Sequence, residues 1–216
     1  MRSTELFTRF LSAIVVAAAL QLGMAQAADA AEAPQYKVGD TWKYGRTDLW
    51  RNERTEGWTL TVAGIADGQV RFDGLNERKE NFRLFYTLDG NYISGGRNHI
   101  KPYVPQLSFP LAVGKTWSGE YEWKNRQGIY GTSDIKVKVL ARETVTVPAG
   151  TFDAFKIESQ GSYRRSDSSG VGSMRSLYWY APSVKRIVRE EYRDTTTMGQ
   201  QWDQHITVLE SYKLAQ

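Results

Sequence analysis

The sequence predicts an all-β protein, an antiparallel sandwich or partly closed barrel of about ten to twelve strands. Apolar and polar residues alternate with a period of two along much of the chain, which is typical of strands with one face against a core. Asp-Gly pairs and other turn signals separate these stretches at hairpin spacing. No stretch has the convincing period of an amphipathic helix.

Two hairpins are expected in the first half of the chain, with turns at Asp67-Gly68 and Asp89-Gly90. Asp-Gly readily adopts the positive φ angles that a tight hairpin turn requires. The flanking segments are rich in β-branched and aromatic residues, as strands prefer. These segments are 59–65, 70–75, 82–88 and 91–95.

The middle of the chain is interrupted by Pro102, Pro105 and Pro110. Proline removes a backbone donor from a sheet, so it is confined to edges, bulges and connections. We therefore expect residues 97–114 to cross between two sub-sheets.

Alternation resumes in the second half, with a turn at 148–150 and the longest loop at 166–173. The residues expected on the core-facing side are Trp117, Gly119, Tyr121 and Trp123, then Ile135, Val137 and Val139, then Trp202, Gln204, Ile206, Val208 and Tyr212.

The N-terminus has the layout of a cleaved secretory signal. Arg2 and Arg9 form a positively charged start before a short apolar run over 10–22, and small residues follow at A-x-A spacing. The run is too short for a membrane anchor, which needs about 20 apolar residues. We predict a signal peptide over 1–27, with cleavage as late as 33, and a periplasmic or secreted single β-rich domain over 34–216 that does not span a membrane.

The pattern V-G-x-T-W occurs twice, at 38–42 and at 113–117. A duplicated β-meander would explain it, with 36–96 and 109–195 as related halves. Coincidence over five residues is the alternative.

Three longer motifs occur in order: FPLAVGKTW at 109–117, VPAGTF at 147–152 and WYAP at 179–182. Together they resemble the TapB-like group of bacterial exported proteins, over roughly residues 36–195. This chain has Lys185 where relatives typically have glycine. The group has no assigned function, so the resemblance implies no catalytic residues.

Catalytic chemistry has few candidates in this composition. The chain has no cysteine and only two histidines, His99 and His205, which we expect at the surface or as caps. A hydrolytic triad and a zinc site both lack partners. We therefore predict no catalytic, cofactor-binding or metal residues, no cofactor, and a protein that is not an enzyme.

Two pairs of carboxylates share a neighbourhood in the sequence. Glu120 and Glu122 would lie about 6.6 Å apart on one strand face, near the spacing that glycosidases use. They alternate with aromatic residues, however, so we expect them on the solvated outer face. Glu190 and Glu191 are adjacent and should point to opposite sides of their strand.

The seven tryptophans and twelve tyrosines either fill the core or line a cavity for an apolar or glycan ligand. The net charge of +4 is modest, and basic residues at 78–83, 164–165 and 185–189 either favour anionic partners or are scattered solvated charges. The preferred hypothesis is a binding or carrier module for an apolar, lipid or glycan ligand or an envelope protein partner. The alternatives are a small outer-membrane β-barrel and an unrecognised hydrolase. Nucleic acid is not expected.

Overall fold

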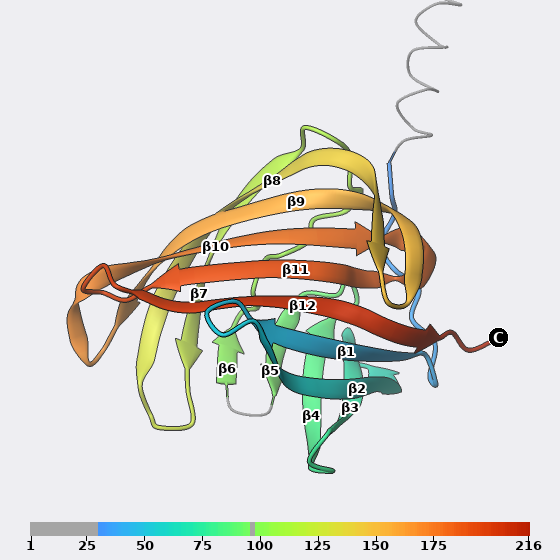
Figure 1. Ribbon diagram of the computed structural model, residues 1–216, viewed down its shortest axis with the longest axis horizontal. Coiled ribbons are helices and arrows are strands. Elements are labelled where there is room, and N and C mark those ends of the chain that lie inside the picture. Colours follow the sequence, from blue (N-terminus) through green and yellow to red (C-terminus); the bar gives the residue numbers. More distant parts are fainter. Residues whose placement is uncertain (1–29, 96–97) are drawn as a thin grey trace, which may run out of the picture. The chain divides into compact units, whose positions relative to one another are not determined.

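Twelve antiparallel strands close into one barrel, in which each strand pairs with its neighbours in the chain and β1 pairs with β12 (Figure 1). The computed structural model describes residues 30–95 and 98–216, so the predicted leader over 1–27 lies outside the described residues. The all-β antiparallel prediction is confirmed, and the closed barrel is the arrangement found. The strands are β1 (Thr41–Asp48), β2 (Glu53–Ala66), β3 (Gln69–Asn76), β4 (Asn81–Thr87), β5 (Tyr92–Gly95), β6 (Asn98–Lys101), β7 (Thr116–Lys124), β8 (Tyr130–Val147), β9 (Gly150–Arg165), β10 (Ser168–Ala181), β11 (Arg186–Thr195) and β12 (Gln201–Lys213).

Helix is confined to one 3₁₀ turn, Pro182–Val184, within the described residues. No helix in this part of the chain is long and apolar enough to cross a membrane.

The period-two pattern and the turn signals account for most strands. Ile135, Val137 and Val139 are buried on the inner side of β8, as predicted. Asp67 and Gly68 have φ of 52° and 72°, the positive values that a two-residue hairpin turn needs. Local sequence therefore determines both the faces of the strands and this connection.

The proline-rich segment between β6 and β7 runs through the barrel. The backbone amide of Val104 donates to the Tyr92 carbonyl of β5 at 2.8 Å, and the side-chain Nε2 of Gln106 donates to the Tyr178 hydroxyl of β10 at 3.2 Å. Because β5 and β10 lie on different arcs of the wall, residues 102–115 cross the interior. The expected crossing between sub-sheets is therefore wrong in detail, since one closed sheet surrounds the segment.

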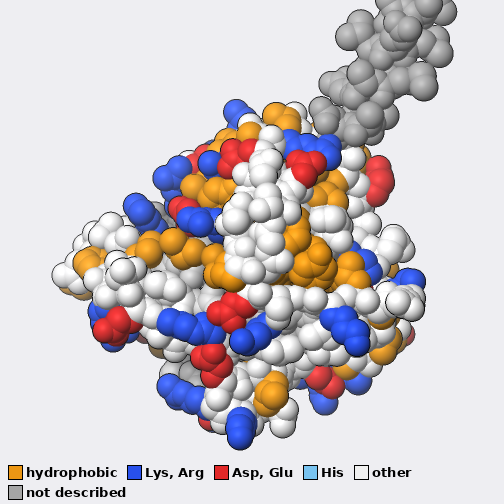
Figure 2. All heavy atoms as spheres, turned by 45° about the vertical axis from the view of Figure 1, so that its right-hand side comes forward, with side chains coloured by type: hydrophobic (Ala, Val, Ile, Leu, Met, Phe, Trp, Pro, Cys, Tyr) orange, Lys and Arg blue, Asp and Glu red, His pale blue; other side chains and the backbone are white. Residues whose placement is uncertain are grey.

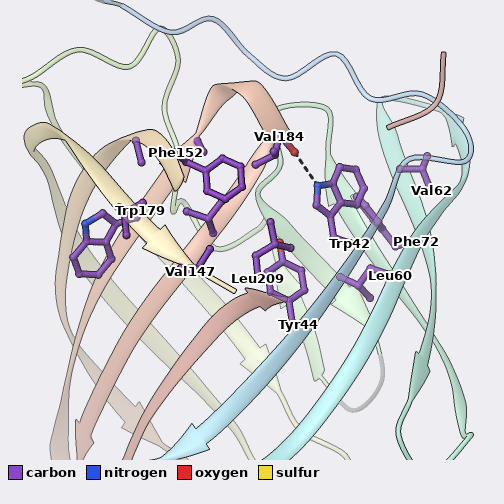
Figure 3. Packing of buried hydrophobic residues seen from close by; sticks show 14 of the residues in the cluster. Trp42, Tyr44, Leu60, Val62, Phe72, Val147, Phe152, Trp179, Val184 and Leu209 are labelled. Carbon is purple, nitrogen blue, oxygen red and sulfur yellow. Dashed lines mark hydrogen bonds between the residues drawn. The ribbon is translucent and has the colours of Figure 1, made fainter. Parts of the chain in front are cut away.

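One end of the barrel is closed by a cluster of buried side chains (Figure 3). Trp42 and Phe72 enter it from β1 and β3, and both are fully buried. Val147 and Phe152, at the end of the β8–β9 hairpin, belong to the same cluster. The apolar core thus fills this end and leaves the rest of the interior to other side chains.

The two V-G-x-T-W motifs have the same backbone structure. Gly39 and Gly114 have φ of 94° and 87°. Their amides donate to the carbonyls of Val62 and Val139 respectively, each at 2.9 Å. One motif opens β1 and the other opens β7, so each begins a run of six strands. The duplication itself stays a prediction.

The side assigned to the core in β12 is wrong. Trp202 and Tyr212 are 73% and 42% exposed, whereas His205, Thr207 and Leu209 are buried. The physical reason is that β12 has apolar contacts on both faces, because Val208 of the opposite face packs against the core cluster. A single dry face is therefore absent from its sequence.

The predicted loop at 166–173 is also shorter than expected, because β10 already begins at Ser168. Gly170 lies so close to the backbone of Thr197 that a β-carbon would collide with its carbonyl. Glycine here allows the connection between β11 and β12 to approach β10 closely. The segment expected over 82–88 ends as a strand at Thr87, so Leu88 lies beyond β4 and is 47% exposed.

Candidate functional site

The barrel encloses a cavity of about 360 Å³, within the range of small-molecule pockets. Its walls come from opposite arcs of the barrel, from the segment before β1 and from the interior crossing. The lining residues are Tyr36, Tyr44, Arg46, Glu56, Trp58, Leu60, Phe82, Leu84, Tyr86, Gly90, Tyr92, Gln106, Leu107, Tyr178, Tyr180, Lys185, Arg186, Ile187, Glu190 and Thr207.

Aromatic rings make up much of the wall. Tyr44 stacks on Trp58 with ring centroids 5.8 Å apart, and Tyr86 meets Tyr92 edge-on at 5.5 Å. Such pairs are rigid and apolar apart from the phenol oxygens. The sequence is consistent with two roles for the aromatic residues, core filling and lining of a cavity. Both are found, since some fill the core and others line this cavity.

Arg186 is the unusual charge in this wall. Its guanidinium lies 4.7 Å from the centroid of Tyr86, 5.0 Å from Phe72 and 5.8 Å from Trp42. No carboxylate of the described residues forms an ion pair with it, and its Nε is buried without a hydrogen-bond partner. Cation–π contacts with three strands thus hold the side chain in place.

The turn before β11 directs Arg186 inward. Lys185 has φ of 62°, a left-handed conformation that favours glycine, and its Nζ lies 2.7 Å from the carboxylate of Asp40. Asp40 is fully buried and also accepts hydrogen bonds from the amides of Lys37 and Ala215. This ion pair explains why a lysine occupies a position suited to glycine.

The pKa of Asp40 reflects the same contacts. Burial alone would raise it, but the hydrogen bonds from Lys185 and from the Lys37 and Ala215 amides hold the pKa below its usual value. Asp40 is thereby ionised and neutralises Lys185. Arg186 remains a cation without an ion pair among the described residues at this end of the cavity.

Tyr180 carries a second polar atom without a partner. Its side chain is 1% exposed, and its hydroxyl has no hydrogen-bond partner among the described residues. The Tyr36 and Tyr44 hydroxyls, by contrast, donate to the carbonyls of Lys185 and Ile187. Burial raises the pKa of Tyr36 to about 12 and raises the pKa of Tyr180 too, so these phenols are neutral at physiological pH.

The other end of the cavity is polar and half-exposed. Arg46 and Glu56 lie there with their charged groups 4.0 Å apart, and the Arg46 guanidinium sits 5.3 Å from the Trp58 ring. Both residues also line a polar surface cleft with Asp203 and His205. The cavity therefore extends from Arg186 to a polar mouth marked by Arg46 and Glu56.

The two histidines have different environments. His99 is exposed on β6. His205 is buried, stacks on Tyr192 at 5.0 Å between centroids and hydrogen-bonds to Asp203 through Nδ1 at 3.0 Å. The expected surface or capping role is wrong for His205, because closure of the barrel places its side of β12 inside.

The acidic pairs lie as predicted. Glu120 and Glu122 are exposed on the outer face of β7. Glu190 lines the cavity, whereas Glu191 points away from it and pairs with Arg189 at 2.6 Å. Burial raises the pKa of Glu190, and the charges of His205 and Arg46 oppose that rise.

Sequence reasoning missed Arg186 because it lies in a basic run, 185–189, that has the appearance of solvated charge. Its aromatic contacts come from three distant strands and exist only in the closed barrel. Among the described residues, no group of three or more His, Asp or Glu side chains could hold a metal ion.

Comparison with known proteins shows a shared fold. A family model described as DUF3108-like matches residues 121–200, which overlaps the span of the TapB-like resemblance. A candidate lipoprotein from Parabacteroides distasonis matches with a TM-score of 0.53 at 17% identity, over 84% of this chain and 97% of that one. A candidate exported protein with a YmcC-like fold from Bacteroides fragilis gives a TM-score of 0.52 at 17% identity, over 85% and 99%.

The hypothetical lipoprotein YmcC from Escherichia coli gives a TM-score of 0.50 at 11% identity, over 82% of this chain and 85% of that one. No curated protein matches the sequence. The solved structures thus share the barrel, and the matched family is the DUF3108-like one. The TapB-like grouping stays a prediction.

Proposed function

We propose that this protein is an exported envelope protein that binds or carries a small apolar or amphiphilic molecule inside its barrel. The observation that carries the proposal is the cavity of about 360 Å³ with aromatic walls, a closed end and a polar mouth. Aromatic cavities with a few placed polar groups are the common form of small-molecule sites.

Binding without catalysis suits the placement of the ionisable groups. Arg186 packs against the rings of Trp42, Phe72 and Tyr86, whereas the charges that lower the pKa of Glu190 are those of His205 and Arg46. Acid–base catalysis needs its groups within hydrogen-bond reach of one reacting centre. His205, which also lies inside the barrel, is held by a hydrogen bond to Asp203 and by stacking on Tyr192.

A location in the envelope, periplasmic or secreted, is supported by the predicted leader over 1–27 and by the descriptions of two structures that share the fold, a candidate lipoprotein and a candidate exported protein. The outer surface of the barrel is charged, as expected of a surface that contacts water and not lipid. Outward positions of β7 and β8 carry charges such as Glu120, Lys136 and Lys138. Figure 2 shows charges of both signs interspersed over one face. A lipid-facing barrel needs an apolar outer band instead.

The test uses the processed chain, purified without detergent, and the neutral apolar fluorophore N-phenyl-1-naphthylamine. We expect saturable binding of about one probe per chain. Leu84→Trp, which fills the cavity, should abolish that binding. Thr144→Trp on the outer face of β8 is the matched control and should leave it unchanged. Absence of saturable binding, or equal binding by both variants, would contradict the proposal.

A further inference from the structure

Two buried side-chain atoms lack a hydrogen-bond partner in the described part of the chain, and both belong to residues that line the same cavity. They are Nε of Arg186 and the hydroxyl of Tyr180. Leaving a buried polar atom unpaired is costly, so native structures rarely contain such groups without a reason. Their coincidence in one cavity indicates a polar ligand group there.

The nature of that group follows from the charge of Arg186. A guanidinium stays protonated in proteins, so its charge cannot be removed by titration. Aromatic rings compensate only part of the cost of burying it. A group that completes the site must therefore be negatively charged, and a planar fork of donors suits a carboxylate or phosphate.

The neighbouring side chains cannot supply the charge. The Tyr36 and Tyr44 hydroxyls lie near Arg186, but burial raises the pKa of both, so they are neutral. Asp40 contacts this turn, but its carboxylate already pairs with Lys185. The charges that lower the pKa of Glu190 are those of His205 and Arg46, and Glu56 pairs with Arg46 at the mouth.

The rest of the wall suits an apolar body. Trp58, Leu60, Phe82 and Leu84 line the cavity together with Arg186. A molecule with its anionic end at Arg186 would contact these side chains along its length.

We infer that the cavity binds an apolar molecule through a single anionic headgroup, a carboxylate or phosphate, which pairs with Arg186 and accepts a hydrogen bond from Tyr180. This inference rests on the proposed function and names the class of its ligand.

Calorimetric titration at neutral pH with dodecanoate, dodecyl phosphate and dodecanol tests it. We expect the wild type to bind at least one of the two anions about tenfold more tightly than the alcohol. Arg186→Met should reduce that preference to within about twofold, whereas Lys138→Met, on the outer face of β8, should preserve it. Equal affinity for alcohol and anions, or an unchanged preference in Arg186→Met, would overturn the inference.

Tyr180→Phe provides a second variant in case Arg186→Met does not fold, because it removes only an unpartnered hydroxyl. It should weaken binding of the preferred anion several-fold and leave dodecanol unchanged, and equal effects on both would overturn the inference. Inorganic phosphate and acetate are separate arms. Binding of either as tight as that of its dodecyl counterpart would assign the site to free anions and overturn the apolar part.

The neutral fluorophore separates the two proposals. If the fluorophore binds the wild type but the two dodecyl anions bind no more tightly than dodecanol, the headgroup inference fails while the carrier function stands. If neither the fluorophore nor any dodecyl compound binds, the proposed function fails as well.

Discussion

The indole Nε1 of Trp42 donates a hydrogen bond of 2.8 Å to the carbonyl of Val184, and both residues are fully buried (Figure 3). This bond joins the first strand to the turn that immediately precedes β11. Since Arg186 follows two residues later and also contacts the Trp42 ring, one side chain fixes both the turn and the cation. The closed end of the barrel and the floor of the cavity are therefore one structural unit.

Trp42→Phe should destabilise the protein. The substitution keeps an aromatic ring but leaves the buried Val184 carbonyl without its donor, which costs about 1–3 kcal/mol. Urea unfolding measures the loss. Trp202→Phe, at an exposed position, should change stability by no more than about 0.5 kcal/mol. Equal unfolding midpoints for the two variants would contradict this role of the bond.

Lys185 combines a left-handed backbone with a buried ion pair, and two substitutions separate the effects. Lys185→Ala should lose about 3–5 kcal/mol, because Asp40 is left as an unpaired buried charge. Lys185→Gly should recover about 1 kcal/mol of that loss by removing the strain of the left-handed conformation. If Lys185→Ala equals the wild type in unfolding free energy, the ion pair contributes nothing.

The Asp40 carboxylate should make stability depend on acidity. Its pKa is lowered in the folded state. Its contribution is therefore complete above the unfolded value of about 3.9 and is lost as pH falls through the folded value. Unfolding free energies of wild type and Asp40→Asn, measured from neutral pH downward, should converge in acid. A difference that stays constant below about pH 4 would refute the assignment.

The two V-G-x-T-W turns should respond alike to alanine. Gly39 and Gly114 both have positive φ, and a β-carbon at either meets no atom closer than 3.7 Å. The cost is therefore one of backbone conformation, about 1–2 kcal/mol at each site. Gly64→Ala, where the nearest atom is 3.9 Å away and φ is not positive, is the control and should cost less. Thermal unfolding of the three variants gives the comparison.

Patterns over a few residues predicted the strand faces and turns that are set by neighbouring residues. The alternation of Ile135, Val137 and Val139 identified the buried face of β8, and Asp67-Gly68 identified a turn, because pleat and turn geometry are set by a few neighbouring residues. Closure of the barrel is a long-range property. Closure places His205 inside the barrel and provides apolar contacts on both faces of β12. A short window of sequence indicates neither feature.

The cavity was predicted only in outline. Aromatic richness suggested either a core or a lined cavity, and both are present because Trp42 belongs to the core cluster while Trp58 lines the cavity. Arg186 could not be placed, since its position depends on rings from β1, β3 and β4. A basic run gives no sign of which member points inward.

The stability gained from a bound anion tests the account most directly. A ligand that binds only the folded state stabilises it by about 2.7 kcal/mol at a concentration of 100 times its dissociation constant. Urea unfolding should show this gain when the wild type is given whichever of dodecanoate and dodecyl phosphate it binds more tightly, and little gain for Arg186→Met at the same concentration. Equal stabilisation of both proteins, or none of the wild type by either anion, would contradict a cavity organised around Arg186.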